Sequence, residues 1–182
     1  MSNADPADRP DWAGFARDVI EADVRGGDAT RVAPPDVECG AYGGVFVTLH
    51  KFGRLRGCMG TLDAARPLAE AVRTAAIRVA RDDPRFPPVG VGELQDIELD
   101  VSILSPPWPM TTIDELELGR HGILVQSGER RGLFLPQVAT EHHMSKESFL
   151  SRCAGEKAGL APDAWRDPAT QVLLFTADVY AG

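Results

Sequence analysis

The chain has 182 residues, of which 43% are hydrophobic and 25% are charged, and its formal net charge is −8 at pH 7. This length and composition predict an ordinary soluble globular protein with enough residues to bury a full core. The negative charge disfavours general binding to nucleic acid, because a phosphate backbone needs a basic protein surface.

The three cysteines are Cys39, Cys58 and Cys153. They are too few and too scattered for a disulfide framework or a zinc site, and their odd number is typical of a reducing compartment. The first ten residues lack the hydrophobic run of a signal peptide, and no apolar stretch is long enough to cross a bilayer. We therefore expect a cytoplasmic protein with a disordered tail over residues 1–10 and no membrane segment. The sequence predicts no metal and no cofactor, and it leaves the oligomeric state open.

The N-terminal part is predicted to be a helix followed by a β-hairpin. Apolar residues at three- and four-residue spacing indicate a helix from Asp11 to about Val24, ended by two glycines. After a loop rich in proline and glycine, extended runs over residues 45–51 and 55–62 flank Phe52-Gly53-Arg54. This pattern predicts two antiparallel strands.

The second strand of this hairpin contains an unusual motif, Arg56-Gly57-Cys58-Met59-Gly60. Glycine weakens a strand, so it is usually tolerated where another backbone or a ligand must come close. A three-residue loop with one buried face would set Thr48 opposite Cys58, Leu49 opposite Gly57 and His50 opposite Arg56. Cys58, Arg56, Thr48 and His50 would then share the other face. A two-residue loop would instead move His50 to the apolar face.

A second helix is predicted to begin at Pro67 and to end at Asp83. The segment that follows it is Asp83-Pro84-Arg85-Phe86-Pro87-Pro88. Three prolines fix the backbone of this segment and remove hydrogen-bond donors. We expect a rigid loop that presents Arg85 and Phe86.

The C-terminal half alternates predicted strands and helical segments. Alternating apolar residues indicate strands over 94–104, 121–126, 131–135 and 171–180, the middle two forming a hairpin. Residues 136–160 are expected to be helical in two pieces, with Ser145 capping the second. Antiparallel hairpins interspersed with helices predict an α+β fold.

The residues around Cys58 admit two interpretations. Cys58 is a nucleophile whose proton His50 accepts and whose thiolate Arg56 stabilises, or it is a small buried side chain packed between glycines. Arg56 and Arg85, together with Gly57, Gly60 and Phe86, are candidates for binding a small anionic ligand. Alternatively, Arg85 ties its own loop down through Asp82 or Asp83. Cys39 and Cys153 are interpreted as a loop residue and a helix residue.

Four segments, residues 55–61, 83–88, 101–106 and 135–139, together resemble the AMMECR family, and within it the A proteins of bacterial AmmeMemoRadiSam systems. The resemblance covers about residues 12–180. It implies one domain over 11–182 made of two interlocked α+β subdomains, with largely antiparallel sheets layered with helices and a cleft between the two lobes.

The same resemblance implies a shared pathway with a Memo-type protein and a radical SAM protein, both of which are expected as partners. The family has no established activity, so the expected function rests on the residues around Cys58. From these residues we expect an enzyme that uses a cleft around Cys58 on a small anionic metabolite. The alternatives are a binding or adaptor module that docks partner proteins through the same cleft and, less favoured by the net charge, a nucleic-acid-binding protein.

Overall fold

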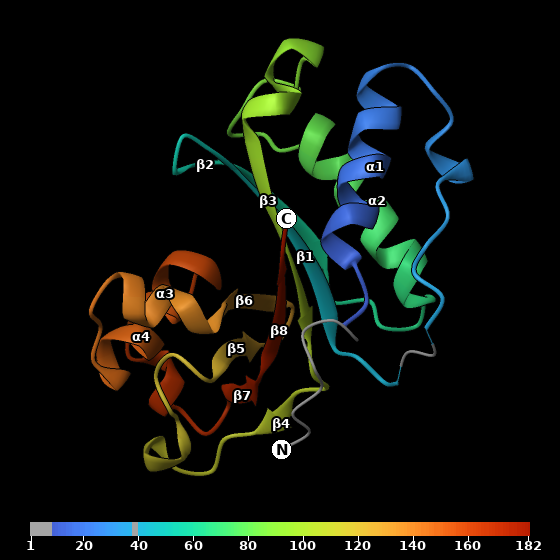
Figure 1. The fold of residues 1–182 in the computed structure, drawn as a ribbon. Helices are drawn as coiled ribbons and strands as arrows, with labels where there is room; N and C mark the ends of the chain where they lie inside the picture. Colours follow the sequence, from blue (N-terminus) through green and yellow to red (C-terminus); the bar gives the residue numbers. More distant parts are fainter. Residues whose placement is uncertain (1–8, 38–39) are drawn as a thin grey trace. The chain divides into compact units, whose positions relative to one another are not determined.

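The computed structural model describes residues 9–37 and 40–182. The predictions for residues 1–8 and for Cys39 lie outside these ranges. The described chain forms two compact units, one made of the residues up to Ile103 together with Val179–Gly182, the other of Leu104–Asp178. Each unit contains a four-stranded sheet and helices (Figure 1). The fold is therefore α+β with antiparallel sheets, as predicted.

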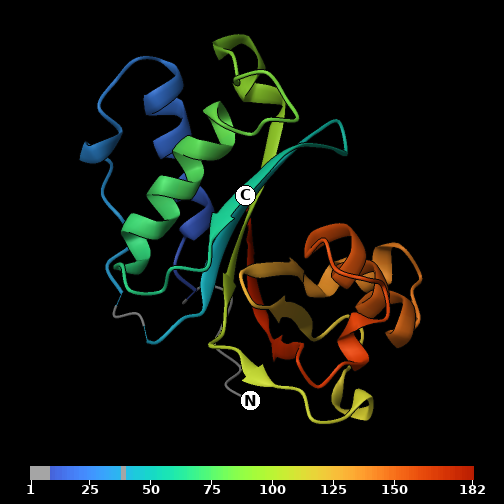
Figure 2. The same cartoon turned by 180° about the vertical axis from the view of Figure 1, so that it is seen from behind.

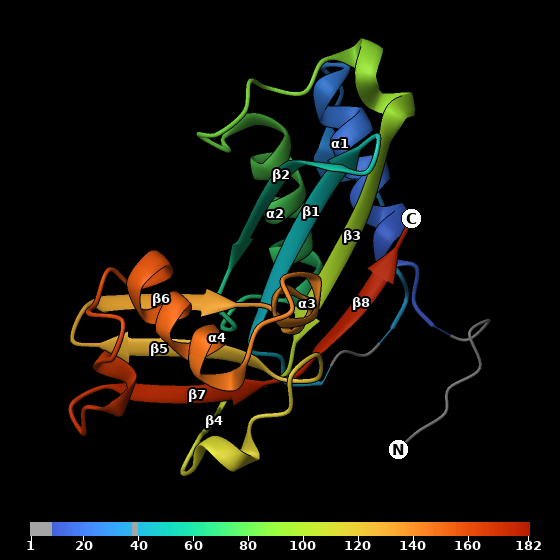
Figure 3. The same ribbon diagram turned by 90° about the vertical axis from the view of Figure 1, so that its left-hand side faces the viewer.

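In the first unit, two helices lie side by side on one face of a sheet (Figures 1 and 3). The strand order of this sheet is β2–β1–β3–β8. The helices are α1 (Trp12–Val24) and α2 (Leu68–Arg81), and the strands are β1 (Gly44–Lys51), β2 (Arg54–Thr61), β3 (Ile97–Leu104) and β8 (Ala177–Ala181). Short 3-10 helices lie at Ala29–Arg31 and Val91–Asp96.

The core of this unit follows the predicted periodicity of the two helices. Phe15 and Val19 of α1 are buried, and so are Val72 and Val79 of α2. The side chain of Asp11 caps α1 by accepting a hydrogen bond from the N–H of Gly14 at 2.7 Å. Apolar burial on this side fixes which face of the sheet is left for polar side chains.

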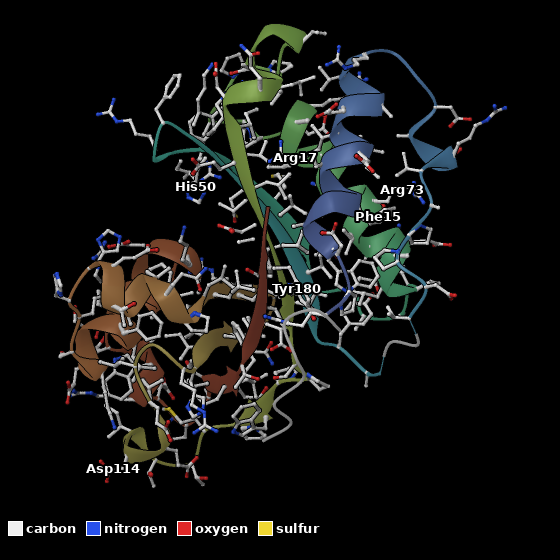
Figure 4. The ribbon with its side chains drawn as sticks, in the orientation of Figure 1. Phe15, Arg17, His50, Arg73, Asp114 and Tyr180 are labelled. Atoms are coloured by element: carbon white, nitrogen blue, oxygen red, sulfur yellow. The ribbon has the colours of Figure 1, made fainter. Side chains whose placement is uncertain are left out.

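Arg73 of α2 fastens the loop that follows α1. Its guanidinium lies 5.0 Å from the centre of the Phe15 ring and donates hydrogen bonds to the carbonyl oxygens of Ala29 and Val32 (Figure 4). A cation over an aromatic face and two bound carbonyl groups offset the cost of enclosing this charge. Arg73 is therefore a structural residue of the helix layer.

The β1–β2 hairpin confirms part of the predicted register and corrects the rest. Thr48 pairs with Cys58 and Leu49 with Gly57, as predicted, but His50 pairs with Leu55 and not with Arg56. The connecting loop has two residues, Phe52 and Gly53, both with positive φ. Between these pairs β2 contains one extra residue, Arg56, which forms a β-bulge. The bulge compensates for the shorter loop, so the pairs from Leu49–Gly57 onward are those predicted.

This bulge also changes the outer end of β2. Strict alternation would place Leu55 on the apolar face together with Gly57 and Met59, yet Leu55 is 43% exposed. The extra residue of a bulge reverses the alternation of side chains along the strand. The alternation of side chains along a strand therefore predicts the correct face from Gly57 onward, but the wrong face for Leu55.

The second unit has its own sheet and its own helices, seen from opposite sides in Figures 1 and 2. The strand order is β4–β7–β5–β6. The strands are β4 (Trp108–Pro109), β5 (Gly122–Ser127), β6 (Arg130–Phe134) and β7 (Gln171–Phe175). The helices are α3 (Pro136–Glu141) and α4 (Lys146–Arg152), which continues as a π-helical turn over Cys153–Lys157. One-turn 3-10 helices lie at Ile113–Glu115 and Ala164–Arg166.

The C-terminal half confirms some of its predicted elements and corrects one. The hairpin around Ser127-Gly128-Glu129 and the Ser145 cap of α4 are confirmed, since the Ser145 hydroxyl accepts from the N–H of Ser148 at 3.2 Å. The single strand over 171–180 is wrong, because the chain leaves the β4–β7–β5–β6 sheet after Phe175 and enters the other sheet at Ala177. None of the helices within 9–37 and 40–182 has the length and apolar composition needed to cross a bilayer.

Candidate functional site

Cys58 lies on β2, the edge strand of the first unit's sheet, and its side chain is neither fully buried nor fully exposed. The hydroxyl of Thr48 donates a hydrogen bond to its sulfur, with Oγ1 and Sγ 3.3 Å apart. Thr48 is the direct cross-strand partner of Cys58, so both side chains project from the same face. The predicted contact between these strands is therefore confirmed at the thiol.

The backbone of Cys58 is bound by the loop that follows α2. Its N–H donates to Oδ2 of Asp83 at 2.9 Å, and its carbonyl oxygen accepts from Nη2 of Arg85 at 3.2 Å. An edge strand normally leaves such groups without a neighbouring strand to pair with. At this position an aspartate and an arginine take the place of that strand.

Asp83 and Arg85 form an ion pair in which the carboxylate is buried and the guanidinium is half exposed. The guanidinium donates from Nη2 to Oδ2 at 2.7 Å and from Nε to Oδ1 at 2.9 Å, while Asp83 is only 4% exposed. These bonds hold the pKa of the Asp83 carboxyl well below its usual range, against the effect of burial. The sequence predicts that Arg85 either binds an anionic ligand or holds its own loop through Asp82 or Asp83. The structure shows the second contact, through Asp83.

Arg56 is also paired with a carboxylate. Its Nη2 and Nε donate to Oε1 and Oε2 of Glu93 at 2.8 and 3.1 Å, and Nη2 also donates to the carbonyl oxygen of Pro87 at 2.9 Å. Together with the N–H of Gly90 and the ammonium of Lys51, Arg56 lowers the pKa of Glu93 to about 2. Arg56 therefore fastens the segment over 87–93 to the hairpin.

Phe86 lies next to both arginines. The centre of its ring is 5.8 Å from Cζ of Arg56 and 5.5 Å from Cζ of Arg85. Both distances are within the range of a cation–π contact. The two predicted ligand-binding arginines are thus brought to one aromatic ring, and each carries its own carboxylate partner.

His50 projects from the face of the sheet that is turned away from α1 and α2 (Figure 4). It is the next residue of β1 on the same face as Thr48, which makes it a diagonal neighbour of Cys58. Its Nδ1 lies 3.8 Å from Oδ2 of Asp100 on the adjacent strand β3. Cys58, Thr48, His50 and Asp100 therefore come from three neighbouring strands.

The two glycines beside Cys58 make room for the protein's own atoms. A Cβ added at Gly57 would lie 3.0 Å from Cγ2 of Val79 on α2, and one added at Gly60 would overlap the carbonyl oxygen of Val45 and the ring of Phe46. Close approach is therefore the reason for both glycines, as the motif indicates. Helix α2 and strand β1 make that approach.

The remaining candidates lie apart from this cluster. Cys153 is fully buried in the second unit, where burial raises the pKa of its thiol to about 12. Within 9–37 and 40–182 no group of three or more histidine, cysteine or acidic side chains is arranged to hold a metal ion. A cavity of about 440 Å³ in the first unit is lined by residues 40–42 and 64–68, none of which is a predicted site residue.

Sequence reasoning misses three acidic members of the site. It gives Glu93 no role and considers Asp83 only as a partner of Arg85. For Asp100, the alternation along residues 94–104 favours a solvent-facing side chain over the alternative of a carboxylate paired with one on a neighbouring strand. The sequence leaves the partner of Arg85 open between Asp82 and Asp83, and the structure shows that it is Asp83. Nothing local in the sequence connects Asp83 with Cys58, because the two residues meet only when α2 packs on β2.

A family model described as AMMECR1 matches residues 13–180. A protein of Methanothermobacter thermautotrophicus is 44% identical over 174 residues, covering 91% of this chain and 90% of its own. Protein MK0488 of Methanopyrus kandleri is 41% identical over 175 residues, covering 91% and 84%.

Among solved structures, the crystal structure of the uncharacterised protein PH0010 from Pyrococcus horikoshii is similar to this chain. Its TM-score is 0.83 at 37% sequence identity, and the match covers 94% of this chain and 91% of that one. The fold is thus shared with PH0010, and the match to each of these proteins extends over more than nine-tenths of this chain.

Proposed function

The chain belongs to the AMMECR1 family, and we propose that it is a cytoplasmic enzyme with Cys58 as its nucleophile. The region that matches the family model contains the whole cluster around Cys58. The substrate is a small metabolite that carries a carboxylate or a phosphate. The proposal extends to a pathway shared with a Memo-type and a radical SAM protein, as the resemblance to AmmeMemoRadiSam systems implies.

The observation that carries the proposal is the fixed position of Cys58. Its N–H is held by the buried carboxylate of Asp83 and its carbonyl group by Arg85, and its sulfur accepts a hydrogen bond from Thr48. The hydrogen bond from Thr48 orients the sulfur, and rigid support of the backbone keeps a nucleophile in its reactive position. A cysteine needed only to fill space requires neither feature.

In the first step, the thiol of Cys58 gives its proton to His50 through one bridging water, because the two side chains are diagonal neighbours, and the carboxylate of Asp100 stabilises the resulting imidazolium. The sulfur forms a bond to an electrophilic carbon of the substrate. The leaving group departs with the electron pair of its bond to that carbon and takes the proton from His50. His50 then takes a proton from a water molecule, whose oxygen forms a bond to the same carbon as the carbon–sulfur bond breaks. The second product leaves, and the sulfur takes the proton back from His50.

The charge of the substrate is met by Arg85. The N–H of Cys58 is already bonded to Asp83, so it is not available as an oxyanion donor. The Arg85 side chain is 48% exposed, and its Nη1 makes no hydrogen bond with any described residue. One edge of this guanidinium is therefore free to receive a carboxylate or a phosphate.

The test is the rate at which iodoacetamide alkylates Cys58 as a function of pH, read by mass spectrometry in a Cys39→Ser background. We expect Cys58 to react about tenfold faster than a free cysteine at pH 7, and about tenfold slower in His50→Gln. His142→Gln, a change at an exposed histidine of the second unit, is the matched control. A Cys58 that reacts as slowly as the buried Cys153 would refute the proposal.

A second function, docking of a partner protein, is favoured by the tip of the β1–β2 hairpin. Phe52 is 76% exposed there and Leu55 is 43% exposed, which is unusual for large apolar side chains. If docking is the function, co-purification with the Memo-type protein survives Cys58→Ser. It is then lost in Phe52→Ser, or in the double variant Arg85→Ala with Phe86→Ala.

A further inference from the structure

One carboxylate oxygen organises the backbone of Cys58. Oδ2 of Asp83 accepts from the N–H of Cys58 at 2.9 Å and from Nη2 of Arg85 at 2.7 Å, and the same Nη2 donates to the carbonyl oxygen of Cys58 at 3.2 Å. The three bonds form a closed ring around one residue of an edge strand. Both backbone groups of Cys58 are satisfied without a neighbouring strand.

The loop that supplies this ring is held in place by other bonds. The N–H of Phe86 donates to the carbonyl oxygen of Asp83 at 3.1 Å, and the N–H of Val89 donates to that of Ala80 at 2.7 Å. These main-chain bonds close the turn after α2, and the Asp83 carboxylate adds one contact within it, because its Oδ1 accepts from the N–H of Arg85 at 3.1 Å. The Asp83 carboxylate is thus hydrogen-bonded to Cys58 and to Arg85. Ending helix α2 would not require an aspartate with these contacts.

Asp83 and Arg85 also balance each other electrostatically beside the thiol. Together they contribute no net charge, whereas either one alone would place an uncompensated charge close to Cys58. Near this part of β2, Arg56 and Lys51 are paired with Glu93, and Nδ1 of His50 lies 3.8 Å from Oδ2 of Asp100. The Asp83–Arg85 pair is the one bonded directly to Cys58.

We propose that Asp83 is a positioning residue for Cys58, and that with Arg85 it fixes the strand edge and sets the charge felt by the thiol. This inference rests on the proposed nucleophilic role of Cys58. It assigns Asp83 no contact with substrate.

The first experiment measures the midpoint of the pH profile of Cys58 alkylation by iodoacetamide. Asp83→Asn keeps an acceptor for the Cys58 N–H but leaves the Arg85 cation uncompensated, so the midpoint should fall by about one pH unit. Arg85→Gln leaves the carboxylate uncompensated, so the midpoint should rise by about the same amount. The double variant should return near the wild-type value. Glu156→Gln, in the exposed Arg152–Glu156 pair of the second unit, is the matched control and should shift nothing.

A purely structural role predicts a different result. Loosening the strand edge would expose the thiol and change the rate in the same direction in both variants, with no displacement of the midpoint. Shifts of the same sign, or no shift in either variant, overturn the electrostatic part of the inference.

The second experiment measures hydrogen exchange at the Cys58 amide and does not require a reactive thiol. Asp83→Ala should accelerate exchange by about tenfold or more, and Asp83→Asn by much less, because only the alanine removes the acceptor. An unchanged Cys58 amide in Asp83→Ala overturns the positioning role itself. If Cys58 is not alkylated but its amide exchanges faster in Asp83→Ala, the nucleophilic role of Cys58 is refuted and the positioning role of Asp83 stands. The two failures are therefore distinguishable.

Discussion

Asp83 accepts a hydrogen bond from the backbone N–H of Cys58 although the two residues are 25 positions apart in the chain. The bond joins the Arg-Gly-Cys-Met-Gly strand to the proline-rich loop, two of the four segments on which the family resemblance rests. Helix α2 makes this possible, because it starts after β2 and ends at the loop, and packs Val79 against Gly57. The two segments form a single structural element.

The Arg56–Glu93 pair should stabilise the fold in a pH-dependent way. The pKa of Glu93 is lowered from 4.5 to about 2, chiefly by its hydrogen bonds from Arg56. A carboxyl whose pKa is lowered by folding contributes its full stabilisation above its unfolded pKa, and this contribution is lost as the pH falls from about 4.5 to about 2. Glu93→Gln should therefore lower the free energy of unfolding by about 2 kcal/mol at pH 7.

The measurement is urea unfolding of both proteins at pH 7, 4 and 2. The difference between wild type and Glu93→Gln should shrink with falling pH and vanish near pH 2. Glu156→Gln breaks an exposed pair and should cost less than about 0.5 kcal/mol. A constant difference at all three pH values would show that Glu93 acts through packing and not through its charge.

Much of the first unit could be predicted from local patterns. The periodicity of α1 and α2 and the alternation along β1 follow from burial on one side, which the sequence records directly. The bulge at Arg56 could not be predicted, because an extra residue in a strand leaves no mark that distinguishes it from a longer loop. The resulting error is one residue in register. The prediction places Arg56 opposite His50, whereas in the structure Leu55 lies opposite His50 and the Arg56 side chain is bonded to Glu93.

Gly60 should be the less replaceable of the two glycines beside Cys58. A Cβ at this position overlaps the backbone carbonyl oxygen of Val45, which cannot move without disturbing the β1–β2 ladder, whereas at Gly57 the nearest atom belongs to the side chain of Val79. We expect Gly60→Ala to lower the free energy of unfolding by about 2–3 kcal/mol, and Gly57→Ala by about 1 kcal/mol.

Chemical denaturation followed by circular dichroism checks this order. Gly92→Ala is the control, since no atom lies within 4 Å of its added Cβ, and its effect should stay within about 0.5 kcal/mol. If Gly57→Ala proves the more costly change, the packing of α2 against β2, and not the spacing of β1 and β2, limits this motif.

The C-terminal strands show a different limit of sequence reasoning. Residues 171–180 read as one apolar strand, but β7 and β8 belong to different sheets and only Thr176 separates them. Alternation reports which face of a strand is buried and says nothing about which sheet buries it. The acidic partners in the site escape prediction for the same reason, because their contacts depend on tertiary packing.

Cys153 should behave as a reporter of unfolding of the second unit. It is fully buried, its sulfur lies 3.4 Å from the carbonyl oxygen of Gly132, and burial raises the pKa of its thiol to about 12. Only the thiolate reacts readily with alkylating agents. At pH 8 we expect no alkylation of Cys153 in the folded protein and full alkylation at the urea concentration that unfolds it. Alkylation of Cys153 in native buffer at the rate of Cys58 would contradict its burial.

Phe52 should be a residue at which stability can be gained. It has φ of 52° in the two-residue turn and is 76% exposed, so an aromatic side chain occupies the left-handed region without burying its surface. Asparagine followed by glycine is the favoured pair for such a turn. Phe52→Asn should raise the free energy of unfolding, measured in urea, by about 1 kcal/mol. Arg54→Lys, at a nearby position without positive φ, is the control and should change it by less than about 0.5 kcal/mol.

The same variant tests whether the tip of the hairpin docks a partner. If the tip of the hairpin docks a partner, as proposed above, the exposed ring of Phe52 contributes to that contact, so Phe52→Asn should also bind the Memo-type protein less tightly. If Phe52→Asn instead destabilises the hairpin, the contact of the ring with the Lys51 ammonium, 5.7 Å from the ring centre, outweighs the backbone strain. The exposure of this side chain then ceases to favour docking, because the contact within the hairpin accounts for the phenylalanine.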